Sequence, residues 1–463
     1  MTLPDEQSVD VADRAAKYAA SLTLDDVPEA VTGRGALVTL DTVGVCLHGG
    51  ETSYVGDVAE HWSRLGRTGL RDGGATVFAD GRRRDVSTAV LLNAAGGTTL
   101  ELDEGNQRSA HPGIHTVPPA LAAAEHLEAS GTELLTAIIA GYEVGARLGD
   151  ANRPMQGNLH PHGGWAPVSG AVAVGLLLGL DESELAEAIR IAVNPFVVGE
   201  WNAALEGATV RNFYTGICCQ HGVSAAVMAA GGVTGVQRAV RRCLLPYTAE
   251  EPVSSVLLAP FDTFGEEFYL TSSYTKVHAA CRYAHAPLEA LASILERVRF
   301  EPDDVDRIIV ETFELGTLLS QTDPSNVLSA KFSTPYALAA RLCTGTSGVD
   351  AFTEELVADD TVRSVASRID VVADETFETR SREGLWGARV TVETVDGETH
   401  TETVEDARGG GENPFTREEV CGKFDDLVSD RLSGAETETL RESLLDISSA
   451  EDVSSLFAPV RKK

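Results

Sequence analysis

Lysine is scarce in this sequence. Only six of its 37 basic residues are lysines, and 70 acidic residues leave a formal net charge of −33. A field of this sign repels nucleic acid and anionic membrane surfaces, since both require a basic face on the protein. An excess of carboxylates with few lysines is typical of a salt-adapted surface, so we expect a halophilic cytoplasm rather than an ordinary acidic protein.

Paired cysteines and long apolar runs are also missing. The seven cysteines are an odd number without a C-x-x-C motif, so we expect reduced core residues rather than disulfides or a zinc site. The first ten residues are acidic where a secretory signal is basic and then apolar. The longest apolar candidate, residues 168–180, is shorter than the roughly 20 residues of a membrane helix. These features predict a soluble, cytoplasmic protein.

From residue 11 to about 245 the pattern is helical. Apolar residues recur at spacings of three and four, most clearly in residues 119–130, 132–150 and 170–178. The acidic residues that begin at Asp181 mark the start of the next helix, because they stabilise the positive end of its dipole.

Alternating strand patterns begin after residue 270. They occupy residues 307–312, 368–372 and 388–404. The last stretch alternates around Asp396 and Gly397, a dipeptide that favours a tight hairpin turn. The sequence therefore predicts a mainly α protein with a smaller α/β domain. We place the all-helical domain at residues 1–269, the α/β domain at 270–407, and returning C-terminal helices at 408–463.

The scarce basic groups and the histidines fall in clusters. Lys276 and Lys331 are the only lysines between Lys17 and Lys423. In a chain that otherwise uses arginine, a retained lysine indicates a need for a compact ammonium charge or a titratable amine, with chance retention as the plain alternative. Six of the eleven histidines form three compact groups beside glycine or proline: His111 with His115, His160 with His162, and His278 with His285. Loops carry many functional groups, so these three groups favour one shared site.

Carboxylates accompany the first histidine group. Glu101, Asp103 and Glu104 stand within ten residues of His111, where we expect them to interrupt an apolar helix. A carboxylate at this spacing can orient an imidazole ring and set its tautomer, whereas a solvated acidic run is the alternative.

Metal binding is the main competing interpretation. The His160-Pro161-His162 run with nearby acids could bind zinc or iron, but no HExxH motif or cysteine pair accompanies it, so we expect no metal. The glycine-rich run 231–235 lacks the lysine of a phosphate loop and predicts a helix C-cap and turn. No G-x-S-x-G motif indicates a serine hydrolase.

Six stretches, in this order and spacing, resemble the MmgE/PrpD family. They are LELDEGNQRSAHPG (100–113), LHPHGGWAPVSGAVAVGLLLGLD (159–181), VRNFYTGICCQHGVSAAVMAAGGVTG (210–235), YTKVHAACRYAH (274–285), KFSTPYALAA (331–340) and NPFTREEVCGKF (413–424). The resemblance covers nearly the whole chain. It implies a large helical domain with a smaller α/β lid, a site between them, and a homodimer. The family's activities include 2-methylcitrate dehydratase, cis-aconitate decarboxylase and iminodisuccinate epimerase.

The resemblance also assigns site residues. It implies active-site roles for His111, His160, Lys276 and Tyr336. Three positions depart from the dehydratase and decarboxylase pattern: Glu101 replaces an aspartate, Gly105 a threonine, and Arg211 a second lysine. Arginine in place of lysine exchanges a point charge for a bidentate carboxylate clamp.

The implied chemistry makes or quenches a carbanion beside a carboxylate, without metal or organic cofactor. We expect Arg211, Lys276 and Arg282 to neutralise the developing charge, with His278 and Lys331 as further contacts to a di- or tricarboxylate substrate. His111 or His160 removes the α proton, the other histidine or Tyr336 protonates the leaving hydroxyl, and Asp103 or Glu101 orients a ring.

The leading expectation is thus a hydro-lyase acting on a methylcitrate-like substrate. A decarboxylase, an epimerase and a non-catalytic carboxylate-binding paralogue are the alternatives. The departures at Glu101, Gly105 and Arg211 permit the last, whereas retention of both histidines and Lys276 argues against it.

Overall fold

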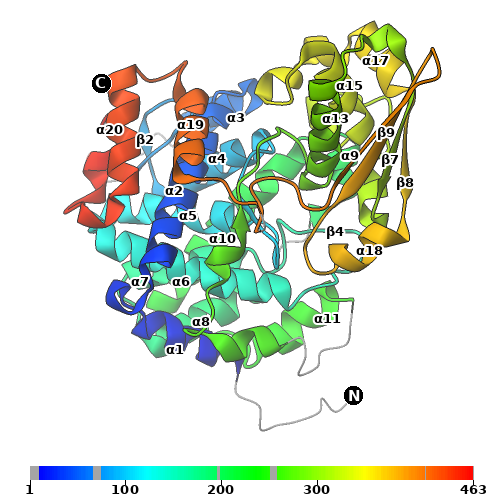
Figure 1. Ribbon diagram of the computed structural model, residues 1–463. Coiled ribbons are helices and arrows are strands. Elements are labelled where there is room, and N and C mark those ends of the chain that lie inside the picture. Colours follow the sequence, from blue (N-terminus) through cyan, green and yellow to red (C-terminus); the bar gives the residue numbers. More distant parts are fainter. Residues whose placement is uncertain (1–9, 66–73, 195–198, 251–257, 412, 462–463) are drawn as a thin grey trace.

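The computed structural model describes residues 10–65, 74–194, 199–250, 258–411 and 413–461. A large helical region fills one side of the molecule in Figure 1, and a smaller region with a single larger sheet fills the other. The expected fold class, mainly α with a smaller α/β domain, is confirmed. The acidic N-terminus, residues 1–9, lies outside the described residues.

The helices of the larger region belong mostly to the first half of the chain. They are α1 (Val11–Ser21), α2 (Glu29–Gly49), α3 (Ser53–Leu65), α4 (Val86–Thr99), α5 (Pro112–Leu127), α6 (Gly131–Asp150), α7 (Pro167–Leu177), α8 (Glu182–Val193), α9 (Asn202–Leu205), α10 (Val210–Ala230) and α11 (Leu245–Thr248). The later helices are α13 (His285–Arg297), α14 (Val327–Lys331), α15 (Thr334–Thr344), α16 (Glu354–Val357), α17 (Asp360–Ala366), α18 (Glu375–Ser381), α19 (Arg417–Val428) and α20 (Gly434–Leu445).

Local capping signals fix several helix ends. The predicted start at Asp181 is confirmed, because Asp181 and Glu184 form a reciprocal capping box at α8. Helix α10 ends at Ala230 with Gly231 as its C-cap, as the glycine run predicts. The pattern misplaces the start of α5, which begins at Pro112, because Pro118 and Pro119 lie inside this helix rather than before it.

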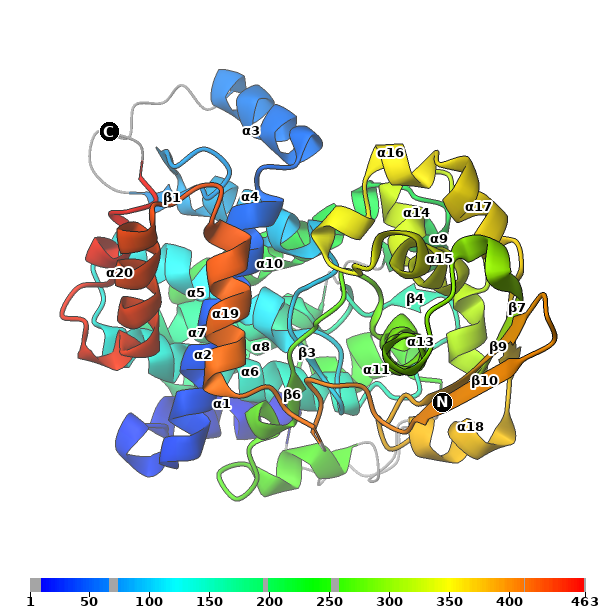
Figure 2. The same ribbon diagram turned by 45° about the horizontal axis from the view of Figure 1, so that its top comes forward.

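The longest apolar helix is α2 rather than residues 168–180. By length and composition, α2 is the one helix in the described part of the chain that could cross a membrane, but 72% of its apolar window is buried inside the protein. It packs against α4 and against the C-terminal helix α19, where Lys423 lies 2.7 Å from the buried Asp41 carboxylate. These contacts are those of a core helix (Figure 2).

The sheet of the smaller region has the strand order β10-β9-β7-β8. The predicted strands are confirmed as β7 (Val305–Thr312), β8 (Ile369–Ala373), β9 (Ala388–Thr394) and β10 (Thr399–Val404). Only the β7–β8 pair is parallel. The predicted hairpin joins β9 to β10, and Gly397 takes the positive φ of 89° that its tight turn requires. Helix α13 packs on β9 and β10 and separates the sheet from the larger region (Figure 2).

Two short antiparallel ladders lie where the two regions meet. Strand β3 (Gly105–Asn106) pairs with β6 (Ser273–Tyr274), and β4 (Leu159–His160) pairs with β5 (Gly199–Glu200). The first ladder holds the acidic segment after α4 beside the segment that carries Lys276. The second places His160 at the same junction.

Candidate active site

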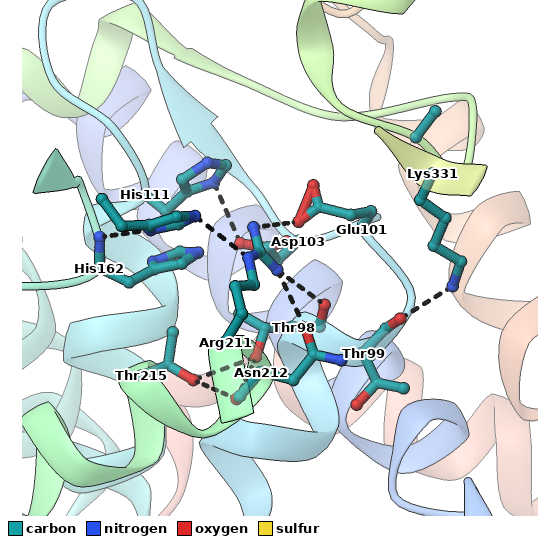
Figure 3. A network of polar contacts seen from close by, with 12 residues as sticks. Thr98, Thr99, Glu101, Asp103, His111, His162, Arg211, Asn212, Thr215 and Lys331 are labelled. Atoms are coloured by element: carbon teal, nitrogen blue, oxygen red, sulfur yellow. Dashed lines mark hydrogen bonds and ion pairs between the residues drawn. The ribbon is translucent and has the colours of Figure 1, made fainter. Parts of the chain in front are cut away.

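The site begins at the C-terminal end of α4. Glu101 and Asp103 follow this helix rather than interrupt it, and Glu101 takes a positive φ of 54°. Cations meet the terminal carbonyl groups, where the helix dipole is negative. Lys331 Nζ donates to the Thr99 carbonyl at 2.8 Å, and Arg211 Nη1 lies 3.5 Å from the Thr98 carbonyl (Figure 3).

Two cations converge on Glu101. Arg211 Nη2 lies 2.5 Å from one carboxylate oxygen, and Lys276 Nζ lies 3.2 Å from the other. All three side chains are at most 2% exposed. Burial alone would raise the pKa of Glu101, but Arg211 and Lys276 lower it below its usual value. Glu101 is therefore an ionised carboxylate held between two buried cations.

A second carboxylate holds His111. His111 Nδ1 lies 3.0 Å from an Asp103 oxygen and 2.8 Å from the Glu104 carbonyl, and Lys276 Nζ lies 3.8 Å from the other Asp103 oxygen. Burial would raise the pKa of Asp103, whereas His111 and Lys276 hold it below its usual value. The carboxylate orients the imidazole and leaves Nε2 available for a ligand.

An N–H donor faces each ring nitrogen of His160. Arg211 Nε donates to its Nε2 at 3.1 Å, the backbone N–H of His162 donates to its Nδ1 at 3.1 Å, and Trp201 stacks on the ring. A neutral imidazole has one acceptor nitrogen, so both donors cannot be satisfied at once. Burial and then Arg211 lower the pKa of His160 well below its usual value, which keeps the ring neutral.

The sequence singled out His115 and His162 only as neighbours of other histidines, and the structure places both in the cluster. His162 Nδ1 lies 3.1 Å from His115 Nε2, and both rings are fully buried. His162 Nε2 has no hydrogen-bond partner among the described residues. The signal that could have found them is their spacing from His111 and His160, because it allows each pair to face one site.

One group of ligand atoms is compact enough for a metal. Within the described residues, one atom each from Asp103, His111 and His162 lies within 4.8 Å of the others. A divalent ion there would compete with the Lys276 ammonium for Asp103. These ligand types are ones that zinc binds, but the negative charge of Asp103 is already compensated by Lys276.

Three other predicted residues use their polar groups elsewhere. Tyr336 donates to the Ala351 carbonyl at 3.0 Å. His278 Nδ1 lies 2.6 Å from Ser347 Oγ, and Arg282 donates to the carbonyls of Ala407 and Arg408. The third histidine group, His278 with His285, is therefore a separate cluster. Arg282 binds the backbone of the segment that leads to α19.

Of the three departures from the family pattern, those at Arg211 and Gly105 have a local explanation, and the one at Glu101 has none. Arg211 reaches Glu101 and His160 together, because its guanidinium presents donors in two directions. A Cβ atom at Gly105 would lie 2.2 Å from the ring of Tyr274, so this ring occupies the space that a threonine side chain would need.

The site is thus a buried set of two carboxylates, three cations and a histidine cluster at the junction of a helical domain with a smaller α/β domain. The chain belongs to the MmgE/PrpD family: residues 13–243 match its N-terminal domain and residues 278–447 its C-terminal domain.

Relatives span almost the entire chain. A cis-aconitate decarboxylase-like protein of Aspergillus oryzae is 25% identical over 95% of both chains. The cis-aconitate decarboxylase of Aspergillus terreus is 23% identical, with 95% of this chain and 94% of the relative covered. That of Homo sapiens is 24% identical, with coverages of 94% and 91%. The last two relatives are decarboxylases by name, which is a lyase-type activity.

Proposed function

We propose that this protein is a lyase that removes carbon dioxide from a cis-aconitate-like tricarboxylate. The observation that carries the proposal is the convergence of Arg211 and Lys276 on one buried carboxylate. Cations that neutralise Glu101 there can also neutralise a substrate carboxylate, and the names of the full-length relatives favour decarboxylation over the hydro-lyase reaction.

Decarboxylation forms an anion, so the site must supply positive charge that stabilises it. When a carbon–carbon bond to a carboxylate breaks, carbon dioxide leaves and the electron pair moves through the double bond to the carbon beside another carboxylate. The resulting enolate-like anion is stabilised by preorganised cations, which act strongly in a buried site. Lys276 and Arg211 supply this charge, and a proton delivered to the far carbon completes the product.

His111 and His160 are the groups proposed to handle the proton. The Asp103 carboxylate compensates positive charge on His111, which suits a donor. His160 is kept neutral by burial and Arg211, so in the decarboxylation it serves to hold this guanidinium rather than to donate the proton. A neutral base is what the dehydration of a 2-methylcitrate-like substrate requires, so the hydro-lyase remains the second candidate.

Proton NMR in D2O at high salt distinguishes these reactions. The purified protein is incubated with cis-aconitate, 2-methylcitrate, citrate and malate derivatives. We expect carbon dioxide loss from cis-aconitate, with one deuterium in the product. An unsaturated product from 2-methylcitrate would replace the decarboxylase with the hydro-lyase, and exchange without net product would favour an epimerase. Saturable binding without any change would contradict the lyase and favour a carboxylate-binding paralogue.

Metal dependence and assembly complete the proposal. We expect activity to survive exhaustive chelation, and its loss with recovery on zinc would assign Asp103, His111 and His162 as ligands. We also propose a cytoplasmic homodimer in a salt-rich cell, without nucleic-acid or membrane partners. Light scattering during gel filtration at high salt tests the dimer, and a monomer mass would contradict it.

A further inference from the structure

His162 carries a buried polar atom that the proposed proton transfer does not use. The ring is fully buried, and its Nε2 has no hydrogen-bond partner among the described residues. An unpaired buried polar atom destabilises a fold, so buried polar groups are nearly always paired. When such an atom lies in a functional site, it marks a place for a polar atom of a ligand.

The ring of His162 lies inside the proposed site. Its centroid is 4.9 Å from that of His111 (Figure 3) and 4.7 Å from that of His160. One nitrogen of His162 lies within 4.8 Å of an Asp103 oxygen and of a His111 nitrogen. A substrate bound beside His111 therefore also lies close to His162.

His115 determines which nitrogen of His162 carries the proton. His115 Nδ1 lies 4.0 Å from Cys219 Sγ, and His115 Nε2 lies 3.1 Å from His162 Nδ1. Burial raises the pKa of Cys219 well above its usual value, so the sulfur keeps its proton. A thiol is a weak donor and a weak acceptor, and an N–H of His115 aimed at it would gain little. The proton of His115 is better placed on Nε2, where His162 Nδ1 accepts it.

His162 then carries its own proton on Nε2. Burial, followed by His160 and Arg211, lowers the pKa of His162 well below its usual value, so the ring is neutral and has one N–H. Since Nδ1 accepts from His115, this N–H is on Nε2, which has no acceptor within the described part of the chain. A polycarboxylate substrate brings the missing acceptor, because hydrogen bonds to charged oxygens are the strong ones.

We infer that His162 is a further substrate-binding residue, whose neutral Nε2–H donates to a carboxylate oxygen of the substrate, and that His115 is the positioning residue that holds this tautomer. The inference rests on the proposed lyase and adds a residue to its site. A neutral imidazole can stabilise charge that develops on an oxygen, as Lys276 and Arg211 do by their positive charge.

Two substitutions distinguish the hydrogen bond of His162 from its volume. H162F keeps a flat ring without an N–H, and we expect it to reduce kcat/KM by about 100-fold, as the loss of a donor to a developing anion does. H162Q places an amide N–H near the position of Nε2 and should recover most of this loss. The matched control is H61F, at an exposed histidine of α3, which should keep wild-type kinetics. Equal losses in H162F and H162Q would assign the effect to volume and overturn the inference.

Nitrogen NMR of protein labelled with 15N at histidine tests the tautomer without turnover. The signals of His162 are those that H162Q lacks. We expect Nε2 to be protonated and its signal to shift when propane-1,2,3-tricarboxylate is added, since this compound has the carboxylates but no double bond. H115F removes the donor to Nδ1 and should give His162 as a mixture of both tautomers. A proton on Nδ1 in the wild-type protein, or no shift at saturation, would overturn the inference.

Failure of this inference and failure of the proposed lyase give different results. Decarboxylation by the wild-type protein with unchanged kinetics in H162F would remove His162 from substrate binding and leave the lyase intact. Absence of any decarboxylation would contradict the lyase. The titration with propane-1,2,3-tricarboxylate would then test His162 alone, and an unchanged Nε2 signal would overturn its role.

Discussion

Lys276 contacts both buried carboxylates of the site, so its removal should affect the reaction and the fold differently. We expect K276M to lower kcat/KM by about 100- to 1,000-fold, because one preorganised cation is lost. The buried Glu101 and Asp103 also lose a partner, which should lower the melting temperature. The matched control is K17M, at an exposed lysine of α1. Equal kcat/KM values for K276M and K17M would remove this lysine from the mechanism.

His160 is the proposed base of the hydro-lyase reaction, and in the decarboxylation it holds Arg211. Replacement by alanine should reduce kcat by about 100-fold or more, the usual cost of losing a general acid or base. His61, exposed on α3, provides the control H61A. Because a packing defect would also lower kcat, the pH profile is the second readout. H160A that keeps the wild-type profile and turnover would show that His160 only fills space beside Trp201.

Lys331 should make substrate binding depend on pH. Burial, together with Arg211 and Lys276, lowers its pKa to about 7, while Glu101 opposes the shift. The amine is charged below this pH and neutral above it, so KM should rise as the pH increases through about 7. In K331M the rise should be absent and KM high throughout. Steady-state kinetics between about pH 6 and pH 9 test this, and an unchanged slope in K331M would assign the effect to another group.

The sequence identified many residues of the candidate site but not the directions in which their side chains point. The positions of Glu101, Asp103, His111, Lys276 and Arg211 follow from clustering and family resemblance, and the structure brings them together. Arg282, His278 and Tyr336 have buried partners elsewhere, because nearness to Lys276 or Lys331 along the chain does not determine where a side chain points. Their substrate contacts stay predictions.

Among the elements, those with local signals were predictable. The β9–β10 hairpin follows from alternation around Asp396 and Gly397, and the start of α8 from its capping residues. The ladders β3–β6 and β4–β5 join segments far apart in the chain. Each has only two residues a strand and therefore leaves no periodic pattern. The parts of the fold that assemble the site are thus the parts that local sequence reveals least.

The close packing of α10 on α4 positions Arg211 and should not tolerate a larger residue. A Cβ atom at Gly216 would lie 2.4 Å from the Leu91 backbone oxygen of α4. Thr98 Oγ1 also donates across this interface to the Asn212 carbonyl at 2.9 Å. We expect G216A to lower the free energy of unfolding by about 1–3 kcal/mol and to reduce kcat/KM, because the helices must separate.

An open glycine on another helix provides the control for G216A. A Cβ atom at Gly422, exposed on α19, meets nothing within 4 Å. G422A should therefore be neutral or stabilising by about 0.4–1 kcal/mol, since alanine restricts the unfolded chain. Denaturant unfolding of both variants at one salt concentration compares them. Equal stabilities would show that α10 and α4 have room to adjust.

At the scale of the whole molecule, a helix from the last tenth of the chain packs on one from the first tenth. Helix α19 packs on α2, and the ion pair of Lys423 with Asp41 joins the two helices. Lys423 also donates to the carbonyl of Leu102, which follows Thr99 at the end of α4 by three residues. The composition and periodicity predicted the fold class, whereas the domain boundaries at 269/270 and 407/408 stay predictions. The same Lys423 contact connects the C-terminal helices to the acidic segment of the site.

The acidic surface should make the stability of the fold depend on salt, whereas the turnover of the buried site should not depend on it. With a net charge of −33, repulsion among carboxylates opposes the folded state, and raising KCl from about 0.1 M to about 1 M shortens the Debye length from about 10 Å to about 3 Å. We therefore expect the melting temperature to increase over this range. Exposed ion pairs weaken as well, but each contributes only about 0–1 kcal/mol. The Arg211–Glu101 pair is buried and screened little, so kcat should be retained.

Sucrose, which stabilises folded proteins without screening, is the control. A melting temperature that responds to sucrose but not to KCl would contradict a salt-adapted surface.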